Sequence, residues 1–300
     1  MIRGRSTASV GYLETVAAAA LWGSSGIWST ALFARGLTPG STALLRPALG
    51  GIVLFAAALL VARPALRPGW RAFLILAGLG GAITAVFQIA YQSSLASSGV
   101  PTTVALLYLS PAFTLAASGP LLREWPTARQ LGLAAFSVTG VWLTVTGVEG
   151  ADVTLDLRGL GWGILAGATY AMYSLFGRWG GPRYGPWATL LHSNLGSCVL
   201  MALVLPVAGY PVVLPADGAS WGILAAYSVL TLSAASILYY DALARIEAGR
   251  AAIFTTLEPV VAAVLATIFL NEGLTTRGWF GLAMVVAGVA GAYALERRSV

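Results

Sequence analysis

Long apolar runs separated by short polar connections occupy the whole chain. A bilayer core takes about 20 apolar helical residues to cross, and ten runs reach that length. Their approximate limits are residues 10–33, 40–62, 70–94, 100–121, 128–147, 158–177, 186–207, 217–240, 249–270 and 277–295. The connections hold helix breakers such as Thr38-Pro39-Gly40 and Gly180-Gly181-Pro182. The pattern predicts an all-α integral membrane protein with ten transmembrane helices and no separate soluble domain.

Composition narrows the class of protein further. Of the 300 residues 58% are hydrophobic and 9% are charged, whereas soluble domains carry about a quarter charged residues. This composition excludes a soluble enzyme and a disordered chain. Cys198 is the only cysteine, which excludes a disulfide scaffold. The net charge of +6 comes from 17 arginines scattered between the apolar runs. They form no basic stripe, so we expect no nucleic-acid partner.

Arginine placement predicts the orientation in the membrane. With the N-terminus placed inside, 13 arginines fall in the inner segments, 3 in the outer segments and Arg46 within a span. Cytoplasmic loops carry the excess of positive charge in membrane proteins. We therefore expect a multi-pass protein of the bacterial inner membrane with both termini in the cytoplasm.

The two halves of the chain match at an offset of 148 residues. Ser110-Pro111 falls on Glu258-Pro259, and Glu124 falls on Glu272. The spacing from proline to glutamate is 13 residues in both halves. This correspondence predicts an internal repeat.

An odd number of spans in each repeat would invert the second one. Residues 1–150 and 151–300 each hold five of the predicted spans. The second half therefore enters the membrane from the opposite side, which gives two inverted five-helix repeats (5+5). Such repeats are typical of secondary transporters, whose halves exchange conformations during alternating access.

Several motifs together point to a family. They are Leu21-Trp22-Gly23-Ser24-Ser25, Arg46, Ser110-Pro111 with Glu124, and Leu257-Glu258-Pro259 with Glu272. With these motifs the chain resembles, over essentially its whole length, the EamA-type transporters of the drug/metabolite transporter superfamily. Within it, the chain is most similar to the YddG-type bacterial exporters of aromatic and other neutral amino acids.

The resemblance implies ten helices and export from the cytoplasm. It also implies a cavity lined mainly by spans 1, 3, 4, 6, 8 and 9, with spans 5 and 10 at the periphery. Ser110 stands where the second half has Glu258, so a role for that carboxylate would not be symmetric.

Two ionisable side chains lie within bilayer depth, where each costs about 2.5–3.5 kcal/mol on insertion scales. At 1.5 Å per residue, Arg46 lies roughly 10 Å from the outer side and Glu258 roughly 14 Å from the inner side. We interpret them as a binding or gating pair, in which Glu258 meets a substrate ammonium or a proton and Arg46 meets a carboxylate. The alternative is a structural pair, or an Arg46 that caps carbonyls freed near Pro47.

Pro111 and Pro259 interrupt spans 4 and 9, where each removes one backbone hydrogen bond. Their presence in both halves favours hinges that let spans 3, 4, 8 and 9 rearrange. Static kinks are the alternative.

Mid-span side chains with a polar tip are candidates for an aromatic-lined substrate cavity. They are Trp22, Tyr91, Gln92, Tyr108, Tyr170, Tyr173 and Tyr239. Packing between helices is the alternative for each of them. His192 in span 7 is a further candidate, although a lone histidine is more often a hydrogen-bonded group between helices. It has no His or Cys partner at metal-ligand spacing, so we expect no metal site.

We expect a secondary transporter that exports small neutral metabolites, foremost aromatic and other neutral amino acids, with protons as a candidate coupling ion and no cofactor. A multidrug exporter of the same fold is the alternative, because sparse charge does not separate a lipophilic compound from a neutral amino acid. An intramembrane enzyme is disfavoured, since the chain has one histidine and neither an H-E-x-x-H nor a G-x-S-x-G motif. The sequence leaves open the substrate range, the coupling to protons and the resting conformation.

Small residues in span 10, such as Gly281 and Gly288, form a seam that joins helices or subunits. Monomer and homodimer, surrounded by membrane lipid, are therefore both open.

Overall fold

A computed structural model shows a bundle of helices, and it describes residues 2–147, 157–269 and 273–298. In the first half the elements are α1 (Ile2–Gly23), α2 (Ser25–Phe33), α3 (Pro39–Val61), the 3-10 turn η1 (Arg63–Leu66), α4 (Trp70–Phe73), the π-helical segment η2 (Leu74–Gly80), α5 (Gly81–Leu107), α6 (Ser110–Leu122) and α7 (Ala128–Val145). In the second half they are α8 (Leu157–Tyr184), α9 (Pro186–Val207), α10 (Gly218–Tyr227), the π-helical segment η3 (Ser228–Ala234), α11 (Ala235–Arg245), α12 (Ala248–Thr255), α13 (Glu258–Phe269) and α14 (Thr276–Arg298).

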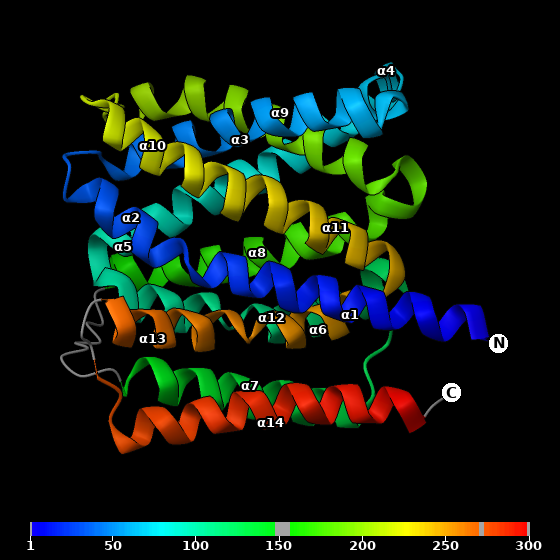
Figure 1. The fold of residues 1–300 in the computed structure, drawn as a ribbon. Helices are drawn as coiled ribbons and strands as arrows, with labels where there is room; N and C mark the ends of the chain where they lie inside the picture. The colour runs from blue at the N-terminus through cyan, green and yellow to red at the C-terminus, as the bar shows by residue number, and fades with distance from the viewer. Residues whose placement is uncertain (1, 148–156, 270–272, 299–300) are drawn as a thin grey trace.

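Both ends of the chain lie at the same end of the bundle (Figure 1). We call this end the terminal face and the opposite end the distal face.

Eight helical segments in the described ranges are long and apolar enough to cross a membrane. They are Ala8–Phe33, Pro39–Val61, Trp70–Ser94, Thr102–Leu122, Pro186–Val207, Gly218–Arg245, Ala248–Leu265 and Thr276–Ala294. The other two expected spans form helices α7 and α8, which are less apolar. Arg129 and Gln130 lie in the first turn of α7, and α8 is rich in Gly, Tyr and Trp.

The distribution of polar groups is that of a protein in lipid. Large apolar side chains cover the outside, and Leu60 and Val207 are 80% and 89% exposed. Hydroxyl side chains fill the inside, where Thr144, Thr189 and Ser197 are fully buried. Each of these three donates to a backbone carbonyl of its own helix, as buried polar groups must.

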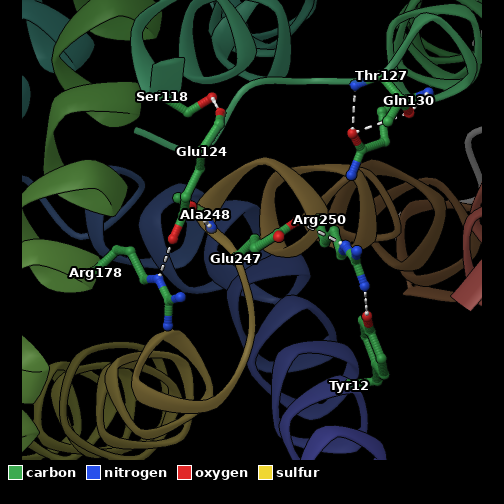
Figure 2. A network of polar contacts seen from close by, with 9 residues as sticks. All are labelled: Tyr12, Ser118, Glu124, Thr127, Gln130, Arg178, Glu247, Ala248 and Arg250. Carbon is green, nitrogen blue, oxygen red and sulfur yellow. Dashed lines mark hydrogen bonds and ion pairs between the residues drawn. The ribbon is translucent and has the colours of Figure 1, made fainter. Parts of the chain in front are cut away.

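Local sequence sets where helices begin. Thr38 accepts a hydrogen bond from the Ser41 backbone at 3.1 Å and caps α3, whose first residue is Pro39. Thr127 and Gln130 form a reciprocal capping box at the start of α7 (Figure 2).

The chain stays helical between the third and fourth expected spans but reverses direction there. Ser94 Oγ and Thr103 Oγ1 lie 2.8 Å apart. In a straight helix nine residues would separate them by about 13.5 Å along the axis. The contact therefore requires a sharp turn between them within the helical stretch labelled α5.

Helix breaks recur at the 148-residue offset. Helix α5 ends at Leu107 and α12 at Thr255, while α6 begins at Ser110 and α13 at Glu258. Each break lies directly before the paired prolines expected to interrupt spans 4 and 9. Helices α7 and α14 also begin 148 residues apart.

Some contacts between the two halves occur twice, the second time with the roles of the two halves exchanged. A Cβ on Gly11 would meet Ile246, and a Cβ on Gly159 would meet Ser98. The two glycines and the two partners each differ by 148 residues. Such exchanged contacts are those of a two-fold arrangement. The same exchange relates the pairs Gly140 with Val285 and Gly288 with Ser137.

Helices α7 and α14 lie side by side in a layer at one edge of the bundle (Figure 1). A Cβ on Gly140 would lie 2.8 Å from the Gly281 carbonyl oxygen, and one on Gly281 would lie 2.4 Å from the Thr144 nitrogen. Their backbones approach this closely because glycine has no side chain. The small-residue seam of span 10 is thus occupied by α7 of the same chain.

Candidate functional site

A cavity of about 80 Å³ lies in the interior between helices of both halves. Its size is enough for several water molecules. We call it the central cavity. It is lined by Trp22, Ser25, Arg46, Thr84, Phe87, Gln88, Tyr91, Gln92, Leu107, Tyr170, Tyr173, Tyr227, Leu232, Ser236 and Glu258.

Glu258 is the first residue of α13 and faces the central cavity from the break before Pro259. The Tyr170 hydroxyl donates to its Oε2 at 3.5 Å, and the Tyr108 hydroxyl is a second hydrogen-bond partner. A Cβ on Gly23 would lie 2.6 Å from the Glu258 carbonyl oxygen. Because Gly23 has no side chain, the end of α1 approaches the start of α13 closely. This approach places Glu258 beside the first helix.

Arg46 enters the same cavity from α3. Its Nη1 donates to the Tyr227 hydroxyl at 3.0 Å and to Thr231 Oγ1 at 3.4 Å. The guanidinium also lies over the Tyr227 ring, 4.9 Å from the centroid, which is a favourable cation–π arrangement. Ser29 donates to the same tyrosine hydroxyl at 3.0 Å. Neutral groups thus hold the guanidinium in place.

The two charges share one cavity without neutralising each other directly. Arg46 and Glu258 both line it, yet neither takes part in any of the ion pairs found among the described residues. Both side chains are only partly buried. Each of the two charges therefore lines the cavity without an ion-pair partner among the described residues.

The π-helical segment η3 organises this wall of the cavity. The Trp22 indole Nε1 of α1 donates to the Thr231 backbone carbonyl at 2.7 Å, and the Thr231 side chain is one of the partners of Arg46. A π-helix shifts the backbone hydrogen bonds out of their usual register and is frequent at functional sites. In this structure Thr231 of η3 contacts both Trp22 of α1 and Arg46 of α3.

Aromatic rings cover the rest of the cavity. The Phe87 and Tyr170 rings stack with centroids 5.3 Å apart, and Tyr170 stacks on Tyr173 at 6.3 Å. Tyr239 packs edge-on against Trp22 at 5.0 Å. The arrangement offers flat apolar surface with two opposite charges at its margin.

Each half of the chain resembles the same family of known proteins. A model of the EamA-like transporter family matches the chain twice, at residues 9–146 and 157–294. The two matches begin 148 residues apart and together span most of the chain. The chain belongs to the EamA-like transporter family. It carries the family's unit in tandem.

Relatives of this EamA-like transporter are themselves named as transporters. The uncharacterized transporter YwfM of Bacillus subtilis (strain 168) is 23% identical over 278 residues, which are 92% of this chain and 91% of that one. The threonine/homoserine exporter RhtA of Escherichia coli (strain K12) is 29% identical over 168 residues, 54% of each chain. A solved crystal structure has the same fold, with a TM-score of 0.82 over 97% of this chain and 98% of that one, at 20% identity.

Most of the residues singled out in the sequence come together in this EamA-like transporter. Those that line the central cavity are Trp22, Arg46, Tyr91, Gln92, Tyr170, Tyr173 and Glu258. Tyr108 adjoins it through its contact with Glu258. Pro111 and Pro259 follow the two helix breaks.

Two expected site residues lie elsewhere. Tyr239 is fully buried behind the cavity wall, and its hydroxyl donates to Ser174 Oγ at 2.7 Å. His192 lies in a lateral groove between α3 and α9, where its Nδ1 is 3.0 Å from the Ala188 carbonyl oxygen. Among the described residues no group of three or more His, Cys, Asp or Glu is placed so that it could hold a metal ion.

Sequence reasoning missed Tyr227 and Phe87. Tyr227 is the main partner of Arg46 and Phe87 supplies a stacking ring. Tyr227 lies about ten residues into the eighth span, at a depth similar to that of Arg46 in the second. A guanidinium within a membrane span needs a hydrogen-bond acceptor. The similar depth of Tyr227 is the sequence signal that identifies it as a candidate.

An ion-pair network closes the terminal face of the bundle. Figure 2 shows Glu124, in the connection after α6, with Arg178 Nε at 2.6 Å from one oxygen and the Ala248 backbone nitrogen at 3.2 Å from the other. Arg178 also donates to the Leu243 carbonyl at 2.9 Å. One carboxylate of the first half thus contacts α8 and α12 of the second, and Arg178 extends the network to α11. Glu272, its counterpart by sequence, lies outside the described residues.

Two further pairs join α1 to the second half at this face. Arg245 lies 3.0 Å from Glu14. Arg250 pairs with Glu247 at 2.8 Å and donates to the Tyr12 hydroxyl at 3.5 Å (Figure 2). Polar contacts from Glu14 and Tyr12 therefore tie α1 to the second half at the terminal face.

Proposed function

We propose that this EamA-like transporter exports neutral amino acids, aromatic ones among them, from the cytoplasm through the central cavity. The observation that carries the proposal is the placement of Glu258 and Arg46 on different helices around one cavity, unpaired with each other.

The proposed substrate matches the cavity group by group. A neutral amino acid carries an ammonium, which suits the Glu258 carboxylate, and a carboxylate, which suits the Arg46 guanidinium. An aromatic side chain would stack against the rings of Phe87 and Tyr170, since ring pairs favour offset or edge-on contact. Small-molecule sites commonly combine apolar walls with a few placed polar groups in this way.

A relative supports the substrate class. RhtA, which shares 29% identity over about half of each chain, is named a threonine/homoserine exporter. Both of its named substrates are neutral zwitterions. The resemblance to YddG-type exporters points to the same class with aromatic side chains.

The proposed mechanism is alternating access by two inverted repeats. In this proposal α7 and α8 complete ten spans, residues 1–150 and 151–300 form the two repeats, and both termini are cytoplasmic. The exchanged contacts of Gly11 and Gly159 support the inversion, because one lies near Arg245 at the terminal face and the other lies near the turn of α5. Ligand sites commonly occupy about 300–1,000 Å³, so the central cavity must widen to admit substrate.

Liposomes with purified protein test the proposal. Labelled phenylalanine, methionine and threonine would be followed with and without a pH gradient, for the wild type, Glu258→Gln and Asp217→Asn. Asp217 caps α10 at the distal face, far from the cavity, and asparagine keeps that cap. We expect saturable uptake that Glu258→Gln lowers at least tenfold and Asp217→Asn leaves intact.

The gradient separates two versions of the mechanism. Uptake driven by the gradient and lost in Glu258→Gln identifies proton exchange through that carboxylate. Uptake equal in both conditions identifies facilitated diffusion. Absence of flux for all three amino acids, together with flux of a lipophilic dye, would replace the proposal with a multidrug exporter.

A further inference from the structure

A lateral groove of about 850 Å³ lies on the outside of the bundle, separate from the central cavity. It runs between α3 and α9 and is bounded by the connection before α4. Its walls are mainly apolar side chains that face outward, and Ile52, Phe55 and Leu195 are 65%, 50% and 48% exposed. A groove with such walls at the depth of a membrane span faces lipid chains.

One end of the groove is basic. Arg67 and Trp70 line it, while the nearby Arg63 begins η1 and Arg71 lies in α4. Within the described chain no carboxylate lies at ion-pair distance from any of these three arginines. Arg63 donates to the Leu59 carbonyl at 2.8 Å and Arg71 lies over the Trp70 ring at 5.4 Å. Their charge is thus available to an anion.

We propose that this groove binds an anionic phospholipid, with an acyl chain along Ile52, Phe55 and Leu195 and the phosphate at Arg67. The basic end lies at the terminal face, because α3 begins at the distal face and ends at Val61 (Figure 1). In the proposed orientation, on which this step rests, the terminal face is cytoplasmic, and basic pockets between spans on that side attract anionic headgroups. Trp70, which is 70% exposed, stands where interfacial tryptophans anchor spans at the headgroup level.

A second copy of the chain is a poorer occupant. A two-fold dimer places the same patch of both subunits against each other. Two clusters of three arginines would then face one another at the same height in the membrane. Anionic lipid instead supplies charge of the opposite sign. The site is independent of the transported substrate.

Native mass spectrometry of the full-length protein tests the proposal. Retention of phosphatidylglycerol would be compared with that of phosphatidylcholine for the wild type, Arg67→Gln and Arg183→Gln. Arg183 is the matched control, since it is also near the terminal face but outside the groove, and its carbonyl hydrogen bond and ring contact are both to Trp179. At about fivefold per arginine near the surface, Arg67→Gln should lower the preference for phosphatidylglycerol about fivefold, and Arg183→Gln should not.

A second variant tests the acyl-chain part. Ile52→Trp fills the groove from an exposed position, and we expect it to lower retention of both lipids. Equal preference in Arg67→Gln and Arg183→Gln would overturn the proposal. So would competition by free glycerophosphoglycerol as effective as that of the whole lipid, or a dimer that forms in place of lipid binding.

Discussion

At the scale of single residues, the central cavity is defined by charges held by neutral partners. Tyr108 and Tyr170 hydrogen-bond to Glu258, and Tyr227 supports Arg46. Hydrogen bonds to charged groups contribute about 1.5–3 kcal/mol each. The partners hold each charge at the cavity, and in the proposed function each charge meets one end of the substrate.

Removal of the Tyr227 hydroxyl should weaken substrate binding. In Tyr227→Phe the guanidinium of Arg46 loses its 3.0 Å acceptor but keeps a ring beneath it. We expect KM to rise roughly tenfold, in line with the loss of one charge-assisted hydrogen bond. Initial uptake rates over a range of amino-acid concentrations measure this effect.

Tyr239→Phe is the matched control, because that hydroxyl contacts only Ser174 behind the cavity wall. Equal KM values in the two variants would show that Arg46 does not contact substrate.

The charged residues were predictable from sequence, and their partners were not. Arg46 and Glu258 stand out because charges in apolar spans are rare and costly. Tyrosines such as Tyr227 occur both in cavities and at membrane interfaces, so position along the chain does not separate the two roles. The packing of His192 beside a lateral groove depends on how α9 is rotated, which apolar runs do not specify.

At the scale of elements, the breaks before the paired prolines are the natural points of bending. Helix α12 ends at Thr255 and α13 begins at Glu258. Proline cannot donate to the carbonyl four residues earlier, so Pro259 makes no hydrogen bond to Thr255, and the tighter bond from Leu257 N–H to the Phe254 carbonyl at 3.2 Å stands in the break instead. The same holds at Pro111, between α5 and α6.

Pro259→Ala should stiffen the ninth span. Alanine supplies an N–H for the Thr255 carbonyl and joins α12 to α13. If the break is a hinge, the maximal transport rate should fall several-fold while KM changes little. Pro206→Ala, within α9, is the control. Equal rates in both variants and the wild type would identify the break as a static kink.

The seam between α7 and α14 should respond to a single methyl group. A Cβ on Gly281 would lie within 2.5 Å of the Gly140 carbonyl oxygen and the Thr144 nitrogen, which are backbone atoms. Overpacking of this kind costs about 1–3 kcal/mol. Gly281→Ala should therefore lower the melting temperature followed by intrinsic tryptophan fluorescence.

Gly132→Ala offers a matched control, because no atom lies within 4 Å of the added Cβ. An unchanged melting temperature in Gly281→Ala would contradict the close packing of the two helices.

Proline positions revealed the breaks in advance, whereas the π-helical segments had no sequence signal. Segments η2 and η3 occur in the third and eighth spans. Their hydrogen-bond pattern depends on contacts such as that of Trp22 with Thr231. Because residues of another helix contribute to this hydrogen-bond pattern, the local sequence alone does not predict it.

At the scale of the whole molecule, the internal duplication of the chain could be predicted from the sequence, because proline and glutamate keep their spacing in both halves. The family model matches at the same 148-residue offset. The ion-pair network at the terminal face could not be predicted, since Glu124, Arg178 and the start of α12 are far apart in sequence. In the proposed alternating access, this network separates when the cavity opens at the terminal face.

The measurement that tests the central claim most directly is competition by substrate analogues in the liposome assay. Phenylalanine would compete with labelled substrate beside phenylalaninamide, which lacks the carboxylate, and 3-phenylpropionate, which lacks the ammonium. In the wild type we expect both analogues to compete at least about tenfold more weakly, since each leaves one charge of the cavity without its partner.

The variants assign each charge to its residue. Glu258→Gln should remove the penalty for 3-phenylpropionate alone, and Arg46→Gln should remove the penalty for phenylalaninamide alone. Equal competition by all three compounds in the wild type would contradict recognition of a zwitterion between these two side chains.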